Sequence, residues 1–104
     1  MTQQEQQKVF TQWLSEHKGL FFKVVRSFTQ SKMEAEDLFQ EIAVQVWRSV
    51  PRFRNKSAVS TWIYRVALNT AITWTTKENK QRERNQQLQY DGFVLQSVVE
   101  EREI

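Results

Sequence analysis

The stretch Ser31–Val50, SKMEAEDLFQEIAVQVWRSV, decides the fold of this chain. Its apolar residues recur every three or four positions, which is the spacing that gives an α-helix one buried face. Ser31 and Glu34 form a capping-box pattern at the start, and the helix should end before Pro51, because a residue that precedes proline disfavours helical geometry. The stretch therefore predicts one long amphipathic helix. Its expected buried stripe consists of Ala35, Leu38, Phe39, Ile42, Ala43, Val46 and Trp47.

The same spacing predicts three further helices around this stretch. They cover residues 3–17, a shorter segment from about Gly19 to Phe28, and a segment from about Ala58 into the high seventies. Thr29–Lys32 reads as a turn, and Pro51–Ala58 reads as a polar, basic loop. The residues expected to be buried in these helices are Val9, Phe10, Trp13, Leu14, Leu20, Phe21, Val24, Val25, Phe28, Val59, Ile63, Val66, Ala67, Thr70 and Trp74.

The chain as a whole is expected to be all-α, a compact bundle of about four helices. Glycine occurs only twice and proline once in 104 residues, and no stretch alternates polar with apolar residues as a half-buried strand would. The segment Lys77–Gln89 is charged and rich in glutamine, so it is expected to fray into a linker. The expected division is a helical domain over residues 1–84 and the start of a linker over residues 85–104, partly ordered or forming a short helix.

Composition argues against an enzyme and against a membrane protein. The chain has no cysteine and a single histidine, His17, which has no candidate nucleophile near it. The carboxylates near Glu34 lack a partner histidine at the spacing of a di-metal site. No cofactor or metal is therefore expected. No apolar run approaches the ~20 residues of a membrane span, and the first residues do not have the layout of a signal peptide. A cytoplasmic location is expected.

Charge is unevenly distributed along the sequence. Residues 1–50 carry six basic and six acidic groups, residues 51–84 carry eight basic and two acidic groups, and residues 85–104 carry one basic and four acidic groups. The net charge of the middle segment is therefore +6, within a chain whose net charge is +3. A basic segment of this kind suits a polyanionic partner, although a solvated helix face gives the same pattern.

Three surfaces in this pattern could bind a partner. Opposite the buried stripe of the Ser31–Val50 helix lies a polar face with one aliphatic residue, formed by Asp37, Gln40, Glu41, Val44 and Arg48. One edge of the fourth helix carries Trp62, Arg65 and Asn69, which are side-chain types that stack on bases, hold phosphate and read base edges. The preceding loop adds Phe53, Arg54, Asn55, Lys56 and Ser57, a mixture suited to receiving a flipped base. The alternative is that Phe53 and Trp62 belong to the core and the charges only solubilise the domain.

Three motifs taken together, EAEDLFQEIAVQVWRSV, PRFRNKS and STWIYRVALNTAI, resemble region 2 of the sigma-70 family of bacterial transcription initiation factors, and within it the extracytoplasmic-function (ECF) branch. The resemblance covers about Val9–Lys80, and the fixed order of the three motifs is more specific than any one of them. It implies a helical domain that binds core RNA polymerase and promoter DNA without enzymatic activity.

The resemblance also implies a role for each surface. The segment Asp37, Leu38, Gln40 and Glu41, together with Val44, would bind the coiled coil of the polymerase beta-prime subunit. The loop Phe53–Ser57 and the helix residues Trp62, Arg65 and Asn69 would recognise and melt the minus-ten promoter element, with a non-template-strand base flipped into the loop. Asn69 matches a position that contacts bases at the upstream edge of that element, and Trp62 matches an aromatic residue at the junction of duplex and single strand. Such factors often have an anti-sigma partner.

The sequence departs from the family pattern in two places. The family commonly has an arginine-rich run after the fourth helix, whereas TWTTKENKQRER is more dilute. In the family, a linker then leads to a second DNA-binding domain, so this sequence is expected to be one domain of a longer protein. Two other functions stay open at this point, a helical protein-interaction module and a nonspecific nucleic-acid binder.

Overall fold

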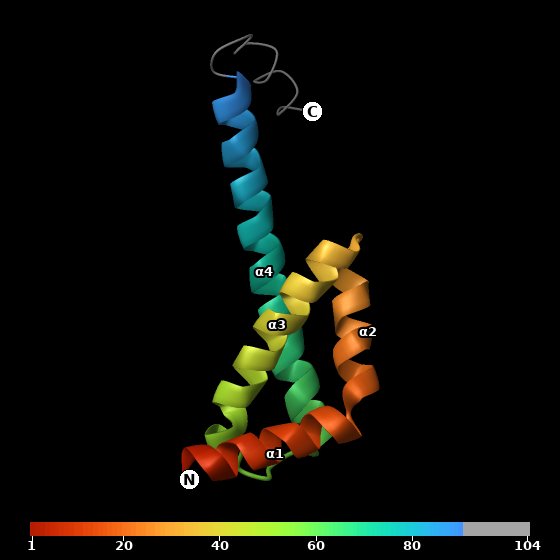
Figure 1. The fold of residues 1–104 in the computed structure, drawn as a ribbon, viewed down its shortest axis with the longest axis vertical. Helices are drawn as coiled ribbons and strands as arrows, with labels where there is room; N and C mark the ends of the chain where they lie inside the picture. Colours follow the sequence, from red (N-terminus) through yellow and green to blue (C-terminus); the bar gives the residue numbers. More distant parts are fainter. Residues whose placement is uncertain (91–104) are drawn as a thin grey trace. The chain divides into compact units, whose positions relative to one another are not determined.

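The computed structural model describes the backbone of residues 1–90 and the side chains as far as Gln81. The chain divides into two units, residues 1–74 and residues 75–104, and each is described by itself. The first unit contains α1 (Gln3–Glu16), α2 (Lys18–Phe28), α3 (Lys32–Ser49), a short 3₁₀ helix η1 (Val50–Arg52) and the first part of α4 (Val59–Tyr90). The expected all-α fold with four helices is confirmed (Figure 1). The predicted pattern over Phe93–Ile104 lies outside the described residues.

Local hydrogen bonds define α1 and its junction with α2. At the start of α1, the Thr2 hydroxyl accepts from the Glu5 N–H and the Glu5 carboxylate accepts from the Thr2 N–H, both at 3.2 Å. This is a complete capping box. The backbone N–H of Thr2, and next its side chain, lower the pKa of the Glu5 carboxyl. α1 ends at His17, whose N–H donates to the Trp13 carbonyl at 2.9 Å, and α2 begins at the following residue.

Ser31 caps α3 as the sequence predicts. Its hydroxyl accepts from the Glu34 N–H at 3.1 Å, while the Glu34 carboxylate accepts from the N–H of Gln30 at 2.9 Å, one residue before the cap. The bond to the Ser31 hydroxyl therefore matches the expected capping box, and the bond to Gln30 differs from it in its donor. α3 ends at Ser49 and continues directly into η1, which contains Pro51. The predicted end of the helix before Pro51 is confirmed.

α4 is longer than the sequence pattern predicted. It begins at Val59, one residue after the predicted start, and continues to Tyr90. The expectation that residues 77–89 fray into a linker is therefore wrong. The segment lacks glycine and proline, and its Lys, Glu, Gln and Arg residues all have high helix propensity. Low apolarity removes a packing face and does not by itself end a helix. The predicted domain boundary after residue 84 stays a prediction.

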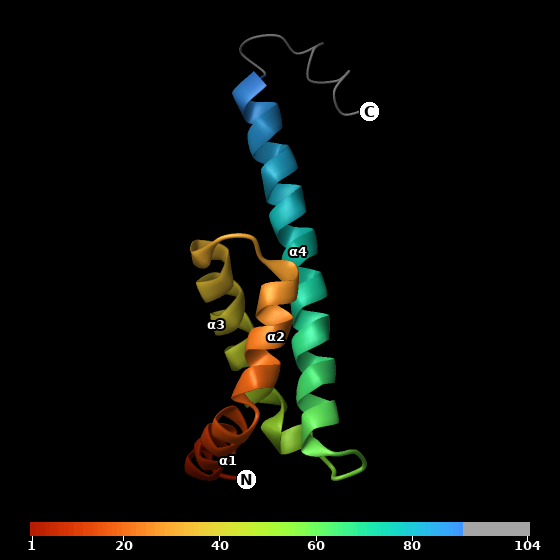
Figure 2. The ribbon, with the colours of Figure 1, turned by 90° about the vertical axis from the view of Figure 1, so that its right-hand side faces the viewer.

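The core of the first unit lies where the helices converge. α1 contacts α2, α3 and η1, and α2 contacts α3, so that α1 lies across one end of the α2–α3 pair (Figures 1 and 2). The predicted stripes supply most of the buried residues, and Val50 and Ala71 join them without having been predicted. The buried apolar residues are Trp13, Phe21, Val24, Val25, Leu38, Ile42, Val46, Val50, Ile63, Ala67, Ala71 and Trp74.

None of the helices in the described part of the chain is both long enough and apolar enough to span a membrane.

Two aliphatic residues of α3 provide a matched test of this core. Ile42 has 0% of its surface exposed and Val44 has 43%. Ile42→Ala is expected to lower the free energy of unfolding by about 2–5 kcal/mol, because it removes buried methylene groups and leaves a cavity. Val44→Ala is expected to change the same quantity by no more than about 0.5 kcal/mol. Urea denaturation followed by circular dichroism measures both, and equal losses would contradict the assigned orientation of α3.

Candidate nucleic-acid and protein interfaces

The loop between η1 and α4 begins with a packed aromatic residue and continues into exposed basic residues. At the anchored end, the Phe53 ring lies 5.4 Å from the Trp13 ring and 5.6 Å from the Trp62 ring, measured between centroids. The following residues, Arg54, Asn55 and Lys56, are exposed, and Ser57 is half-buried. Figure 2 shows the loop projecting at the foot of α4. The tip therefore offers two cations and an amide to solvent.

Asn55 gives this tip its shape. Among the described residues, Asn55 is the one non-glycine residue with a positive φ, at 59°. Asparagine tolerates this left-handed conformation better than most residues, because its short amide can hydrogen-bond locally. The loop therefore turns sharply between the side chains of Arg54 and Lys56.

The edge of α4 predicted to face nucleic acid is exposed at two of its three residues. Arg65 and Asn69 are exposed, and Trp62 is half-buried. The Trp62 indole N–H donates to the hydroxyl of Ser49 in α3 at 3.0 Å. The contacts that the structure gives Trp62 and Phe53 are thus with protein, and their contacts with DNA stay predictions. Arg65 and Asn69 are not covered by the protein's own packing.

On α3, four of the five residues predicted to bind polymerase share an accessible face. Asp37, Gln40 and Val44 are exposed and Glu41 is half-buried. Leu38, the fifth, has 0% of its surface exposed and belongs to the core. Its inclusion in a binding surface is therefore wrong, because a side chain enclosed by its own domain cannot touch a partner. The remaining residues, Asp37, Gln40, Glu41 and Val44, are called the α3 face below.

Asp37 has an internal partner that the sequence did not indicate. The Trp74 indole N–H, from α4, donates to the Asp37 Oδ2 at 2.8 Å. Trp74 itself is buried. The contact joins residues 37 positions apart, so helical periodicity within either segment could not have predicted it.

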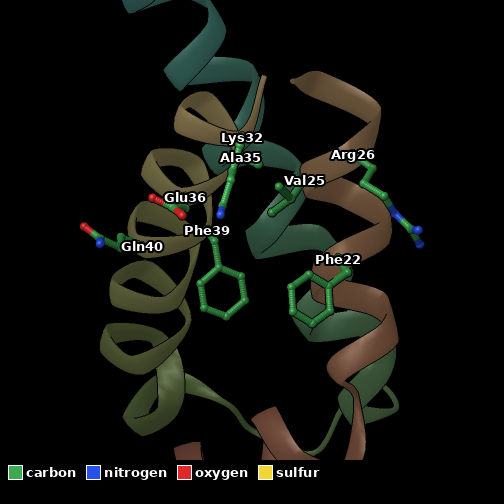
Figure 3. Close-up of a pocket in the computed structure, with 8 residues that line it drawn as sticks. All are labelled: Phe22, Val25, Arg26, Lys32, Ala35, Glu36, Phe39 and Gln40. Carbon is green, nitrogen blue, oxygen red and sulfur yellow. The ribbon is translucent and has the colours of Figure 1, made fainter. Parts of the chain in front are cut away.

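An apolar groove of about 450 Å³ lies between α2 and α3, beside the α3 face. The rings of Phe22 and Phe39 stack across it with centroids 5.5 Å apart and an interplanar angle of 18° (Figure 3). Gln40 belongs both to the groove and to the α3 face. The complete lining is Phe22, Val25, Arg26, Lys32, Ala35, Glu36, Phe39 and Gln40.

Two exposed apolar residues, one on α2 and one on α3, were not identified from the sequence. Phe22 has 41% of its surface exposed and Met33 has 81%. Met33 could have been identified, because it precedes Asp37, Gln40 and Val44 by four, seven and eleven positions, which is the spacing of a single helix face. Phe22 follows the fully buried Phe21 directly, and only the packing of α2 against α3 shows where the second ring lies.

Among the described residues, no group of three or more His, Asp or Glu side chains could hold a metal ion. The cluster Glu34, Glu36, Asp37 and Glu41 is instead divided among different tasks. The Glu34 carboxylate accepts from the Gln30 N–H, the Asp37 carboxylate accepts from the Trp74 indole N–H, and Glu36 lines the groove.

Comparison with known proteins identifies the family. Residues 13–81 match Sigma-70 region 2, and the chain therefore belongs to the sigma-70 region 2 family. Sigma factors are transcription initiation factors and are not enzymes, which agrees with the expectation of a non-enzymatic domain. The resemblance to the ECF branch is confirmed by the relatives that follow.

The relatives are RNA polymerase sigma factors, and some of them are named as ECF factors. The chain is 31% identical over 78 residues to the ECF RNA polymerase sigma-E factor of Haemophilus influenzae, which covers 75% of this chain and 41% of that protein. It is 29% identical over 69 residues to the RNA polymerase sigma factor SigV of Bacillus subtilis, covering 66% and 42%. It is 43% identical over 44 residues to the RNA polymerase sigma-H factor of Pseudomonas aeruginosa, covering 42% and 23%. The chain thus spans less than half of the length of these relatives. No solved structure matches it.

The left-handed conformation of Asn55 can be tested by two substitutions at that position. Asn55→Ala is expected to lower the free energy of unfolding by about 1 kcal/mol relative to Asn55→Gly, because alanine has a Cβ that disfavours this conformation and glycine has none. Chemical denaturation measures the difference. Equal stability of the two variants would show that the loop does not hold this turn in solution.

Proposed function

We propose that this chain is the promoter-opening domain of an ECF sigma factor. It binds core RNA polymerase through the α3 face and captures bases of the non-template strand with the 53–57 loop and the exposed edge of α4. The observation that carries the proposal is the family match over residues 13–81, combined with the exposure of Arg65 and Asn69 directly beyond a cationic loop. A domain working with RNA polymerase would act in the cytoplasm.

The loop with the start of α4 and the α3 face carry opposite charges, and this favours a different partner for each surface. Arg54, Lys56 and Arg65 are exposed around the loop and the start of α4, where they would attract a polyanion. The α3 face instead contains the carboxylates of Asp37 and Glu41, which would repel DNA and attract a basic protein surface. The pattern thus favours nucleic acid at the loop and protein at α3.

The proposed mechanism is strand separation driven by binding energy, without a covalent step. Stacking of a base on an aromatic ring contributes about 1–3 kcal/mol, and flipping a base out of a duplex costs a few kcal/mol. One contact is therefore too weak to hold the strand open. The loop cations, the amide of Asn69 and attachment to polymerase would have to act together, which is why the domain is expected to open DNA only when polymerase holds it.

The groove beside the α3 face supports a helical protein partner. Its lining combines the apolar side chains of Phe22, Val25, Ala35 and Phe39 with the charged Arg26, Lys32 and Glu36, and it includes Gln40 of the α3 face. A helix that places an apolar residue against the stacked rings of Phe22 and Phe39 could contact the α3 face at the same time. The beta-prime coiled coil, which the resemblance assigns to the α3 face, would supply such a helix.

The DNA assignment is tested by two substitutions with different expected outcomes. Asn69→Ala should relax discrimination at one promoter position by about 1–3 kcal/mol, because it removes an amide that reads a base edge. Lys56→Ala should weaken binding to all sequences alike. It should also make the slope of log affinity against log salt shallower by about 0.7 for each phosphate that the variant no longer neutralises. The measurement is binding of labelled non-template-strand oligonucleotides of randomised minus-ten sequence, with and without core polymerase.

Each outcome of this experiment bears on a specific function. An Asn69→Ala variant that keeps the parent's sequence preference would refute the role of Asn69. A parent chain that shows no preference among oligonucleotides and gains nothing from polymerase would be a nonspecific nucleic-acid binder. A parent that binds no oligonucleotide at all would instead be a protein-interaction module.

The polymerase assignment is tested by charge changes on α3. Gln40→Lys and Glu41→Lys should each weaken binding to core polymerase about tenfold or more, because they oppose a basic partner surface at close range. Phe22→Glu should weaken it in the same assay by placing a charge in the groove. Glu16→Lys, on an exposed side chain at the end of α1, is the matched control and should bind as the parent does. Circular dichroism should show the same helix content in all variants, and unchanged affinity in folded variants would reject this surface.

A further inference from the structure

Ser49 is a buried polar residue at the meeting point of three elements. It has 0% of its surface exposed, and among the described residues it is the one polar residue that is buried. Its hydroxyl donates to the Val46 carbonyl at 2.7 Å and accepts from the Trp62 indole N–H at 3.0 Å. The Ser49 hydroxyl and the Trp62 indole N–H therefore each donate to an acceptor within the protein.

A chain of contacts leads from Ser49 to the loop. Ser49 holds the indole of Trp62, the ring of Trp62 lies against Phe53, and Phe53 lies against Trp13 of α1 at an interplanar angle of 87°. Phe53 is the first residue of the 53–57 loop. Its N–H also donates to the Val50 carbonyl at 3.2 Å. The loop therefore leaves η1 from a point fixed by α1, α3 and α4 together.

The hydrogen bond also limits what Trp62 can offer to a partner. An indole has a single polar group, its N–H, and in Trp62 that group is already donated to Ser49. Any contact that the ring makes with a base is then through its π-face or its apolar edge, which every base accepts alike. Reading of base identity is left to exposed polar side chains such as Arg54, Asn55 and Asn69.

We propose that Ser49 is a positioning residue for the 53–57 loop, and that it acts by fixing the indole of Trp62, which in turn fixes Phe53. This inference rests on the proposed function. If the loop binds an extruded strand, it does so in an already ordered conformation. A loop that had to be ordered on contact would lose part of its binding energy to that ordering. Ser49 itself touches no nucleic acid.

The test uses Ser49→Ala in the full chain bound to core polymerase. Removing the hydroxyl leaves the Trp62 N–H without its acceptor. The affinity for a single-stranded minus-ten oligonucleotide is expected to fall between about twofold and tenfold, the range of one net hydrogen bond. Base discrimination should fall with it, while the affinity for polymerase stays at the parent value. A purely structural role would lower the two affinities together, and that result would overturn the proposal.

Two further variants test the hydrogen bond. Trp62→Phe keeps an aromatic ring but removes the five-membered ring that bears the N–H, so it should weaken DNA binding at least as much as Ser49→Ala. Combining the two changes should then weaken DNA binding no more than the stronger single change. Ser27→Ala is the control, because Ser27 is exposed on α2, where its hydroxyl donates to the Lys23 carbonyl at 2.8 Å, away from the loop. It should behave as the parent. Additive losses in the double variant would reject the Ser49–Trp62 link.

Hydrogen exchange provides a readout that does not depend on DNA. In the parent chain, the Trp62 indole N–H should exchange slowly, and in Ser49→Ala both this proton and the amides of residues 53–57 should exchange faster. Equal exchange in the two chains would overturn the positioning role even if the parent binds DNA. Faster exchange in a chain that binds no DNA would uphold the positioning of the loop and refute the proposed function instead.

Discussion

Two indole hydrogen bonds set the register of α4 against α3, and both candidate surfaces depend on that register. Trp62 donates to Ser49 and Trp74 donates to Asp37, at 3.0 Å and 2.8 Å. The two tryptophans are separated by twelve positions on α4, and the two acceptors by twelve positions on α3, about 18 Å of helix in each case. The earlier tryptophan meets the later acceptor, so the two helical segments are antiparallel with matching spacing. Between the bonds, α4 presents Ile63, Ala67 and Ala71, which are fully buried. A shift of one residue would lose both bonds and expose part of that row.

This register leaves Arg65 and Asn69 on the outside of α4. They lie two positions beyond Ile63 and Ala67, which places them about 200° around the helix from the buried row. The register also places Asp37 of α3 beside Trp74, twelve positions and about 18 Å along α4 from Trp62, the residue that contacts Phe53 of the loop. The separation of the exposed basic residues of α4 from the carboxylates of the α3 face is thus a geometric consequence of how two helices pack. Stability of the core and placement of the functional side chains have the same origin.

Helical periodicity predicted most of the fold and part of the site. It identified the four helices, the cap at Ser31, most of the buried row and the exposure of Gln40 and Val44, because each depends on residues close in sequence. Periodicity also predicts that Leu38 is buried. The family resemblance includes Leu38 in a surface because it lies inside a contiguous motif, but a contiguous motif on a helix contains both buried and exposed positions.

Trp62 lies at the boundary between the core and the exposed edge, so its burial depends on whether a hydrogen-bond acceptor such as Ser49 is within reach. That acceptor comes from another helix, and no local pattern could reveal it. The predicted end of α4 is too early because residues 77–89 have few apolar side chains, and a lack of apolar residues does not by itself end a helix.

Asp37 shows how one side chain can serve both the register and the α3 face. A carboxylate has two oxygens and about four lone-pair sites. Trp74 uses one of these sites, on Oδ2, and Asp37 is nevertheless exposed. The remaining sites can accept a donor from a basic partner without releasing Trp74. Moreover, an ionised carboxylate only accepts hydrogen bonds, so the negative charge that would attract such a partner is compatible with the bond that holds α4. The proposed docking of a protein at α3 is therefore compatible with the fixed position of the α4 edge, because the two need not compete for the same lone pair.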